Sequence, residues 1–301
     1  MSNATSLHQN STGAPLLWYR FPQCAAVPYA FIFYYGVKVF NLAVGTPCNA
    51  FVVWQIAARK SDASTSDVFI LSLAVLDACF CLMTPVDLVN TLLVDDFRVW
   101  HYKKFMYGVK DVAPLFLVCI SVDRYVAVVY PVLFAGIRDN RIRSGLCLLV
   151  WGLVLAHGVA KSVLGRKGVN NIFSGVILFA FAVMVFCNVS VVWALRRSVA
   201  GKEEMHPVKR RAFRMVLINL AIIVVNYLPP VALMPFAPYY TFVEFNCQIT
   251  TSVFSIMDLS CSIEPLLYIT KMERTDGGGC WRSRRSRSRP DGSQKSSGQQ
   301  P

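Results

Sequence analysis

Long apolar segments alternate with short polar ones along the chain. Each apolar segment is long enough to cross a bilayer hydrocarbon core of about 30 Å, which takes about 20 helical residues. Only helices and closed barrels satisfy their backbone hydrogen bonds in lipid, and apolar segments of this length indicate helices. The sequence therefore predicts an all-α membrane protein, a bundle of seven transmembrane helices at residues 27–57, 67–93, 105–130, 144–164, 172–195, 208–235 and 242–269.

The composition agrees with lipid as the solvent for most of the chain. Of 301 residues, 55% are hydrophobic and 16% are charged, whereas a soluble domain has about 25% charged residues. A net charge of +13 would suggest nucleic-acid binding in a soluble protein. Here the basic residues lie between apolar segments and in the C-terminal tail, without an aromatic stacking platform. We therefore expect no nucleic-acid partner.

The distribution of basic residues predicts the orientation in the bilayer. Lys and Arg are more frequent in the loops on the side of the C-terminus, which is typical of the cytoplasmic side. Two N-x-[ST] sequons, at Asn3 and Asn10, agree with an extracellular N-terminus. We expect a multi-pass plasma-membrane protein with a glycosylated N-terminus at residues 1–26, a seven-helix domain at 27–270 and a disordered basic cytoplasmic tail at 271–301.

Residues for metal binding or catalysis are not grouped in the sequence. Most of the ten cysteines lie inside apolar segments, where cysteine acts as a small hydrophobe. The four histidines are scattered, and neither a zinc-protease helix, a nucleophile elbow nor a phosphate loop is present. We expect neither a metal site nor an enzyme.

Polar residues and prolines recur at particular depths of the predicted helices. In chain order they form Gly45-Thr46-Pro47-Cys48-Asn49, Leu73-Ala74-Val75-Leu76-Asp77, Asp123-Arg124-Tyr125, Trp151, Tyr227-Leu228-Pro229 and Glu264-Pro265-Leu266-Leu267-Tyr268. From residue 27 to 268 the chain resembles the rhodopsin-like (class A) G-protein-coupled receptors, whose helices carry similar motifs in this order. The Ser260-Cys261-x-x-Glu264-Pro265 form is most similar to the purinergic, protease-activated and lipid receptor branch.

The resemblance implies a receptor that converts binding of an extracellular ligand into activation of a heterotrimeric G protein. Asp123 would hold Arg124 at rest, and the released guanidinium would become a donor for the G protein, with Tyr125 and Tyr268 completing the switch. Pro229 and Pro265 interrupt helix hydrogen bonding and are expected to be hinges. The alternatives are a non-coupling or decoy receptor and, with less support, a transporter or channel, which would show internal repeats.

An internal polar site is expected near the bilayer midplane, where Asn49, Asp77, Ser260 and Glu264 should meet. Two carboxylates there need a cation or a shared proton. The resemblance implies a sodium ion, but Ala113 stands where the family adds a hydroxyl. Sodium and a shared proton are therefore both open, and no other cofactor is expected.

The chain also departs from the family pattern. The usual cysteine at the start of the third helix is replaced near Val99, and the connection after the fourth helix has no cysteine. A second bridge known in the family, which would join Cys24 to Cys247, is expected instead. Ala180 replaces the fifth-helix proline, and Pro114 lies unexpectedly inside the third helix.

We expect a ligand pocket in the outer halves of the helices, with candidate side chains Lys38, Asp87, Lys110, Asp111, Tyr227 and Asp258. Unpaired charges at this depth are costly. We therefore expect Lys110 or Lys38 to pair with Asp258, so that a ligand could compete for one partner. The alternative is a permanent internal salt bridge without a ligand role. Basic residues at the mouth favour an anionic small molecule, nucleotide or lipid.

Overall fold

A computed structural model describes residues 24–58, 66–136, 140–200 and 207–269. The expected glycosylation sites Asn3 and Asn10 and the tail at 271–301 lie outside this part of the chain. Its elements are α2 (Pro28–Phe40), η2 (Asn41–Gly45), α3 (Thr46–Ala58), α4 (Asp67–Leu82), α5 (Thr84–Val89), η3 (Asn90–Val94), α6 (Phe97–Asp111), α7 (Pro114–Val129), α8 (Pro131–Gly136), α9 (Asn140–Ala200), α10 (Pro207–Ile222), η4 (Ile223–Tyr227), α11 (Leu228–Leu233), η5 (Met234–Tyr239), η6 (Val243–Ile249) and α12 (Thr250–Asp258).

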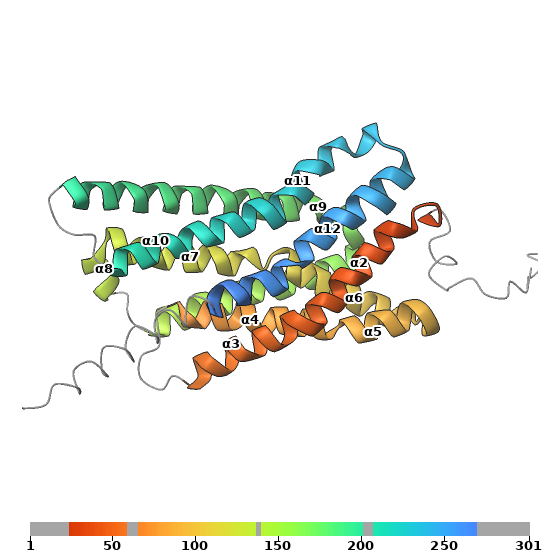
Figure 1. The fold of residues 1–301 in the computed structure, drawn as a ribbon, viewed down its shortest axis with the longest axis horizontal. Coiled ribbons are helices and arrows are strands. Elements are labelled where there is room, and N and C mark those ends of the chain that lie inside the picture. Colours follow the sequence, from red (N-terminus) through yellow and green to blue (C-terminus); the bar gives the residue numbers. More distant parts are fainter. Residues whose placement is uncertain (1–23, 59–65, 137–139, 201–206, 270–301) are drawn as a thin grey trace, which may run out of the picture.

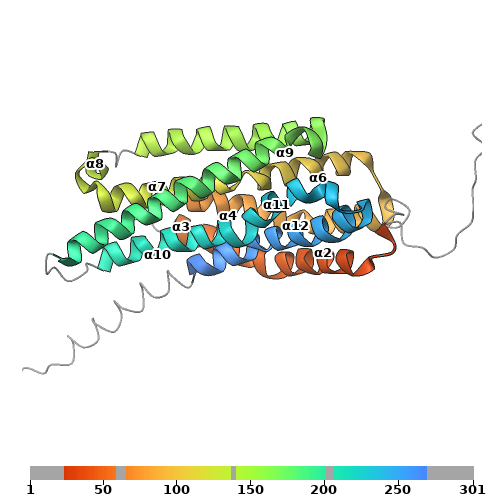
Figure 2. The same ribbon diagram turned by 90° about the horizontal axis from the view of Figure 1, so that it is seen from above.

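These elements form seven helical stretches that are long and apolar enough to cross a membrane, counted over the described residues. Figures 1 and 2 show them side by side along one axis, which confirms the predicted seven-helix bundle. The spans are Pro28–Ala58, Asp67–Val94, Phe97–Val129, Arg141–Gly165, Gly168–Ala194, Val216–Tyr239 and Val243–Ile269. We call the end of the bundle that contains Cys24 the Cys24 end, and the opposite end the Arg124 end.

The third span begins at Phe97 rather than at residue 105, where the sequence analysis placed it. The side chain of Asp96 caps this helix by accepting a hydrogen bond of 2.7 Å from the backbone N–H of Arg98. Our expected boundary was wrong because Lys103 and Lys104 resembled loop residues. The early start instead places Lys103 on the helix, where it faces the second span.

The fourth and fifth spans are both part of α9, which changes direction at Gly165. Gly165 has φ of 70° and ψ of −177°, a conformation that is open to glycine and strained for other residues. Figures 1 and 2 show the chain reversing its direction here. The connection between these spans is consequently very short.

Apolar side chains both fill the bundle and cover its outside. Val52, Phe69 and Phe116 belong to the buried core, while many other large apolar residues, such as Leu148 and Phe179, are exposed. Exposed apolar side chains of this number are expected where lipid, not water, surrounds the helices.

Prolines shape the spans because each one lacks the N–H that would bond to the carbonyl four residues earlier. Pro47 and Pro229 each follow a π-helical turn, η2 and η4 respectively. Pro114 separates α6 from α7 within the third span. In the seventh span, the helix is interrupted at Leu259, a few residues before Pro265. These interruptions lie around the buried polar residues described next.

Candidate functional site

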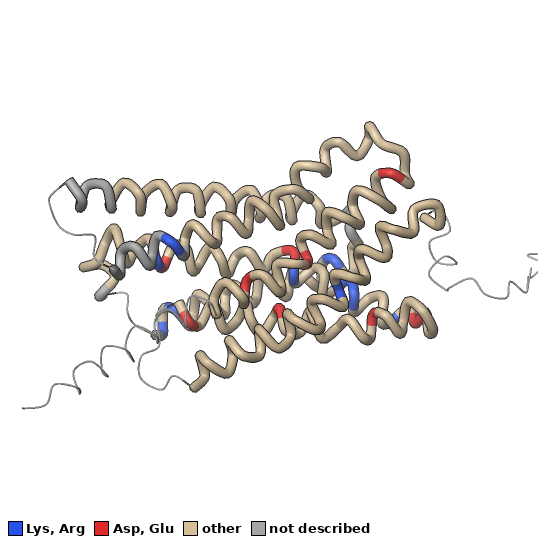
Figure 3. Tube along the Cα trace, viewed as in Figure 1, with Lys and Arg blue, Asp and Glu red and all other residues tan. Residues whose placement is uncertain are grey.

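Charged residues gather in a few places along helices that are otherwise uncharged, as Figure 3 shows. We describe three groups, from the Cys24 end to the Arg124 end. The Asp87 cluster comprises Tyr34, Lys38, Asp87, Lys103 and Tyr107. The Asp77 cluster comprises Asn49, Asp77, Lys110, Ser260 and Glu264. The Asp123 cluster comprises Ser66, Asp123, Arg124 and Arg143.

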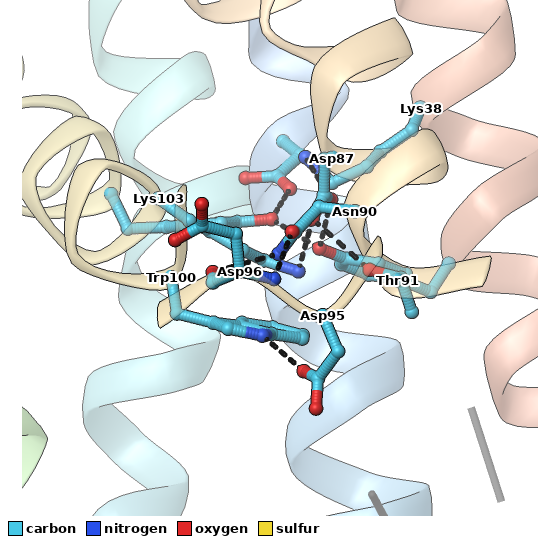
Figure 4. A network of polar contacts seen from close by, with 11 residues as sticks. Lys38, Asp87, Asn90, Thr91, Asp95, Asp96, Trp100 and Lys103 are labelled. Carbon is cyan, nitrogen blue, oxygen red and sulfur yellow. Dashed lines mark hydrogen bonds and ion pairs between the residues drawn. The ribbon is translucent and has the colours of Figure 1, made fainter. Parts of the chain in front are cut away.

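In the Asp87 cluster, one buried carboxylate is shared between two lysines from different spans (Figure 4). The Oδ1 atom of Asp87 lies 2.6 Å from Nζ of Lys103, and its Oδ2 atom lies 3.8 Å from Nζ of Lys38. The hydroxyl of Tyr34 also donates to Oδ2 of Asp87 at 3.3 Å. The first three spans therefore meet at a single acidic side chain.

Lys38 lies in an unusual environment within this cluster. Its Nζ atom is buried and has no hydrogen-bond partner among the described residues. Three aromatic rings surround it, with centroids at 5.2 Å for Tyr34, 4.8 Å for Phe80 and 4.9 Å for Tyr107. Cation–π attraction stabilises an ammonium in such a place, but all its N–H groups remain available to a hydrogen-bond acceptor.

A chain of hydroxyl groups extends from this cluster to the seventh span. The hydroxyls of Tyr34 and Tyr107 lie 2.8 Å apart, and Tyr107 donates to Oδ2 of Asp258 at 3.3 Å. The other carboxylate oxygen of Asp258 is buried without a hydrogen-bond partner in the described structure. Sequence reasoning placed Lys103 among the basic residues at the mouth rather than in the pocket, and it did not single out Tyr34 or Tyr107.

The rim of the cluster is held by the turn between the second and third spans. The Oδ1 atom of Asn90 accepts a 2.7 Å hydrogen bond from the backbone N–H of Asp96. The indole of Trp100 donates to Asp95 at 2.7 Å, and its ring lies 4.8 Å from Nζ of Lys103. These contacts, visible in Figure 4, limit the movement of the Lys103 side chain.

The Asp77 cluster contains a second buried ion pair, made by the third and second spans. Nζ of Lys110 donates to Oδ1 of Asp77 at 2.6 Å, and both side chains are at most 1% exposed. The ring of Tyr227 lies 5.9 Å from this ammonium, and its hydroxyl lies 3.3 Å from Oγ of Ser260. Both oxygens of Glu264 are buried without hydrogen-bond partners in the described structure.

These residues do not fit the sodium ion that the family resemblance implies. Protein-bound hard cations are held by several oxygen atoms. Here the Lys110 ammonium takes the place of a cation at Oδ1 of Asp77. The amide nitrogen of Asn49 points to backbone carbonyls, and buried Ala113 offers no side-chain oxygen.

Two asparagines of the first span replace hydrogen bonds that are missing in the seventh. Pro265 cannot donate to the carbonyl of Cys261, and Asn49 donates to this carbonyl at 2.8 Å instead. The seventh span is also interrupted at Leu259, and there the carbonyl of Asp258 accepts a 2.8 Å hydrogen bond from the side-chain amide of Asn41. Gly45 permits this approach, because a Cβ atom there would lie 2.8 Å from Oγ of Ser262. Expected site residue Asn49 is therefore a backbone partner in this structure.

The Asp123 cluster joins the third span to its neighbours at the Arg124 end. Asp123 accepts a 2.6 Å hydrogen bond from Ser66 and lies 3.5 Å from a guanidinium nitrogen of Arg143. Nε of Arg124 lies 4.0 Å from the same carboxylate, so Arg124 shares Asp123 with Arg143. Tyr125 packs edge-on against Tyr130, with ring centroids 5.9 Å apart.

Tyr268 connects the seventh span to the same region. Its hydroxyl donates to Oδ1 of Asn219 at 3.3 Å, and Nδ2 of Asn219 lies 3.4 Å from Oγ of Ser121. The third, sixth and seventh spans are thus linked through one buried asparagine. Asn219 was not singled out from the sequence, because a lone asparagine in an apolar helix matches none of the motifs that were used.

The expected pairing of Lys110 or Lys38 with Asp258 is wrong. Lys110 pairs with Asp77, and Lys38 lies 3.8 Å from Asp87. Tyr227, also expected in the ligand pocket, contacts Lys110 and Ser260 in the Asp77 cluster. The rotation of each helix about its axis decides which side chains meet, and the sequence does not specify this rotation. Of the other pocket candidates, Asp111 pairs with Lys161 at a very short distance.

Two further features lie at the Cys24 end. Cys24 and Cys247 form a disulfide across a sequence separation of 223, which ties the start of the first span to η6. A cavity of about 840 Å³ lies between α9, α11, η5 and η6, and its wall includes Asn170, Tyr240 and Phe245. Ligand pockets usually measure about 300–1,000 Å³.

Known proteins resemble much of this chain. A family model described as "7 transmembrane receptor (rhodopsin family)" matches residues 48–171. Human G-protein coupled receptor 35 is 29% identical over 218 residues, which cover 68% of this chain and 70% of that receptor. Human lysophosphatidic acid receptor 4 is 24% identical, with 76% of this chain and 72% of the receptor covered. Rat atypical chemokine receptor 3 is 21% identical, with coverages of 82% and 78%.

These matches support a rhodopsin-like (class A) G-protein-coupled receptor.

Such a receptor is a multi-pass plasma-membrane protein that signals through a G protein in response to an extracellular ligand. Members of this family are receptors and generally not enzymes. The relatives do not favour the transporter, channel or decoy alternatives. The signalling role of the motif residues Asp123 and Arg124 stays a prediction from the family resemblance, and the Asp87 cluster lies outside the family motifs.

Proposed function

We propose that the Cys24 end faces the outside of the cell and binds an anionic ligand with an apolar body, and that the Arg124 end activates a heterotrimeric G protein. The disulfide between Cys24 and Cys247 supports this orientation, because disulfides persist in oxidising compartments such as the cell exterior. The bias of basic residues toward the opposite side supports it as well.

The observation that carries the ligand proposal is the environment of Lys38. Its buried ammonium lacks a hydrogen-bond acceptor among the described residues, and the nearby carboxylate of Asp87 is already bound at 2.6 Å by Lys103. Two ammonium groups therefore face one carboxylate. A phosphate or carboxylate group of a ligand would supply the missing acceptor and the second negative charge.

The apolar part of the ligand is assigned to the cavity next to η5 and η6. Its described wall is uncharged and includes Phe242, Phe245 and Met234. Uncharged cavities with a few polar side chains suit the body of an amphiphile. One relative is by its name a receptor for lysophosphatidic acid, an anionic lipid, which agrees with this ligand class.

Ligand binding would act by shifting a balance between two arrangements of the bundle. An anion at Lys38 and Lys103 competes with Asp87, which joins the first three spans. The hydroxyls of Tyr34 and Tyr107 extend this effect to Asp258 in the seventh span. At the Arg124 end, activation requires that Arg124 leave Asp123, the carboxylate it shares with Arg143.

The first test is G-protein activation in cells with an N-terminally tagged receptor and matched surface expression. We expect basal or ligand-induced activation that disappears in Arg124→Ala, because the mutant lacks the guanidinium that the G protein would bind. Activation that persists in Arg124→Ala at equal surface level would contradict the assigned coupling end.

The ligand class is tested with an anionic lysophospholipid, a nucleoside diphosphate and an aromatic carboxylate. An active compound should lose at least tenfold in potency in Lys38→Met, which corresponds to one lost charge-assisted hydrogen bond of about 1.5–3 kcal/mol. Lys104→Met is the matched control, since Lys104 is exposed on α6 beside Lys103. Equal potency in Lys38→Met and in the control would exclude Lys38 as the anion's partner.

A further inference from the structure

Lys110, Ala113 and Pro114 lie within one turn and a half of the third span, and Ala113 and Pro114 depart from the family pattern. Proposed ligand binding uses none of them. The structure brings the consequences of all three together at Asp77, where the family resemblance had placed a sodium ion.

Pro114 breaks the third span directly after Lys110. Because proline has no N–H, the carbonyl of Lys110 loses its regular partner and accepts a 3.2 Å hydrogen bond from Ala113 instead. Val112 has φ of −107° and ψ of 5°, which ends α6. Lys110 thus lies in the last turn of α6, and its side chain reaches across to the second span.

The ammonium of Lys110 has the charge of a sodium ion and lies at the position where a sodium ion would need Asp77. Its Nζ atom is 2.6 Å from Oδ1 of Asp77, and the Lys110 side chain is 0% exposed. A compact ammonium is a point charge with three donors, and a buried charge of this kind persists only when it is paired. A free cation at the same oxygen would have to displace it.

We propose that Lys110 is the built-in counter-cation of Asp77, and that this receptor works without a sodium ion at its central polar site. A sodium ion would need the side-chain hydroxyl that Ala113 lacks as an additional ligand. The Lys110 ammonium does not need it, because it is covalently attached to the third span. A diffusible ion would leave the site when its concentration falls, whereas the Lys110 ammonium stays linked to the third span. The stability of the receptor should therefore not respond to sodium.

The test measures the unfolding midpoint of purified full-length receptor in detergent, in sodium chloride or in choline chloride at equal ionic strength. The wild-type receptor should give the same midpoint in both salts across a hundredfold range of concentration. This measurement requires no ligand and no G protein, so it is independent of the proposed function. A midpoint that rises with sodium and loses this rise in Asp77→Asn or Glu264→Gln would overturn the proposal.

A second experiment removes the ammonium of Lys110. Lys110→Ala leaves Asp77 without its partner and opens space beside it, so that sodium can bind to the carboxylate oxygens of Asp77 and Glu264, which lack other hydrogen-bond partners among the described residues. Its midpoint should rise by roughly 3 °C for each tenfold increase in sodium above the dissociation constant, with no rise in choline. Lys104→Met, which removes an exposed charge from the same helix, should remain insensitive to the cation. A folded Lys110→Ala receptor without any sodium response would refute the claim that Lys110 holds the ion's place.

A double-mutant cycle keeps the pairing testable where Lys110→Ala is too unstable to purify. We expect Lys110→Met with Asp77→Asn to be more stable than the sum of the two single changes predicts, because the double variant leaves no unpaired charge. Surface expression in cells gives this comparison without purification. Strictly additive effects would mean that Lys110 and Asp77 are not partners.

Discussion

The ion pairs of the Asp77 and Asp87 clusters differ in how many partners each carboxylate has. Asp77 is bound by one ammonium, and the two side chains are 1% exposed or less. Asp87 lies between two ammonium groups and also accepts from Tyr34, and Lys103 is 16% exposed. The first arrangement holds two spans in one geometry, whereas the second can lose one partner and keep another.

The number of partners of each carboxylate suggests which ion pair stabilises the fold and which one can respond to a ligand. A buried charge whose sole partner is removed is costly, because nothing nearby can replace the partner. A shared carboxylate tolerates exchange, which is what a competing anionic ligand needs. We therefore assign the Asp77 cluster to the stability of the bundle and the Asp87 cluster to ligand binding.

The largest effect is expected from Lys110→Met. The change keeps most of the side-chain volume but leaves Asp77 as an unpaired buried carboxylate, which should lower the free energy of unfolding by about 3–5 kcal/mol. Thermal unfolding of the purified receptor measures it, with surface expression as a second readout. A loss no larger than that of Lys103→Met would remove the distinction between the two clusters.

Asp87→Asn should have an intermediate effect. It keeps the shape of the side chain but leaves two ammonium groups without a carboxylate. Lys103 can turn toward water, whereas Lys38 cannot, so we expect a cost of about 1–3 kcal/mol from one unsatisfied buried group. The same unfolding measurement applies. If an anionic ligand replaces the lost charge, adding it should stabilise this variant more than the wild type; an equal shift would argue against a shared anion site.

The smallest effect is expected from Lys103→Met. Its side chain is 16% exposed and Lys38 remains near Asp87, so the cost should stay below about 1 kcal/mol, as for accessible ion pairs. The difference from the wild type should shrink further at high salt because the pair is screened. A cost that is large and independent of salt would place Lys103 with Lys110 as a structural residue.

Much of the fold could be predicted from the sequence, because span length and polarity follow from the thickness of the bilayer. The predicted fourth span, 144–164, lies within the observed span Arg141–Gly165. The start of the third span was missed because the N-cap signal of Asp96 was not used and because the partner of Lys103 comes from tertiary structure. Local polarity alone indicated a loop there.

The partners within the site could be predicted less well. The motifs identified Asp77, Glu264 and Asn49, which lie in the expected part of the bundle. Their contacts depend on how far each helix is rotated and where prolines interrupt it, and the sequence does not specify either. The link from Asn49 to Cys261 could have been inferred, since Pro265 must leave that carbonyl without its usual donor.

The tight reversal of α9 at Gly165 has a consequence for the rate of ligand exchange. The fourth span ends at Gly165 and the fifth begins at Gly168, so their connection is too short to fold back across the Cys24 end. This connection therefore adds no barrier to entry or exit. How long a ligand stays bound is then determined by its contacts inside the bundle, and a response that depends on Lys38 should fade at the speed at which that single contact breaks.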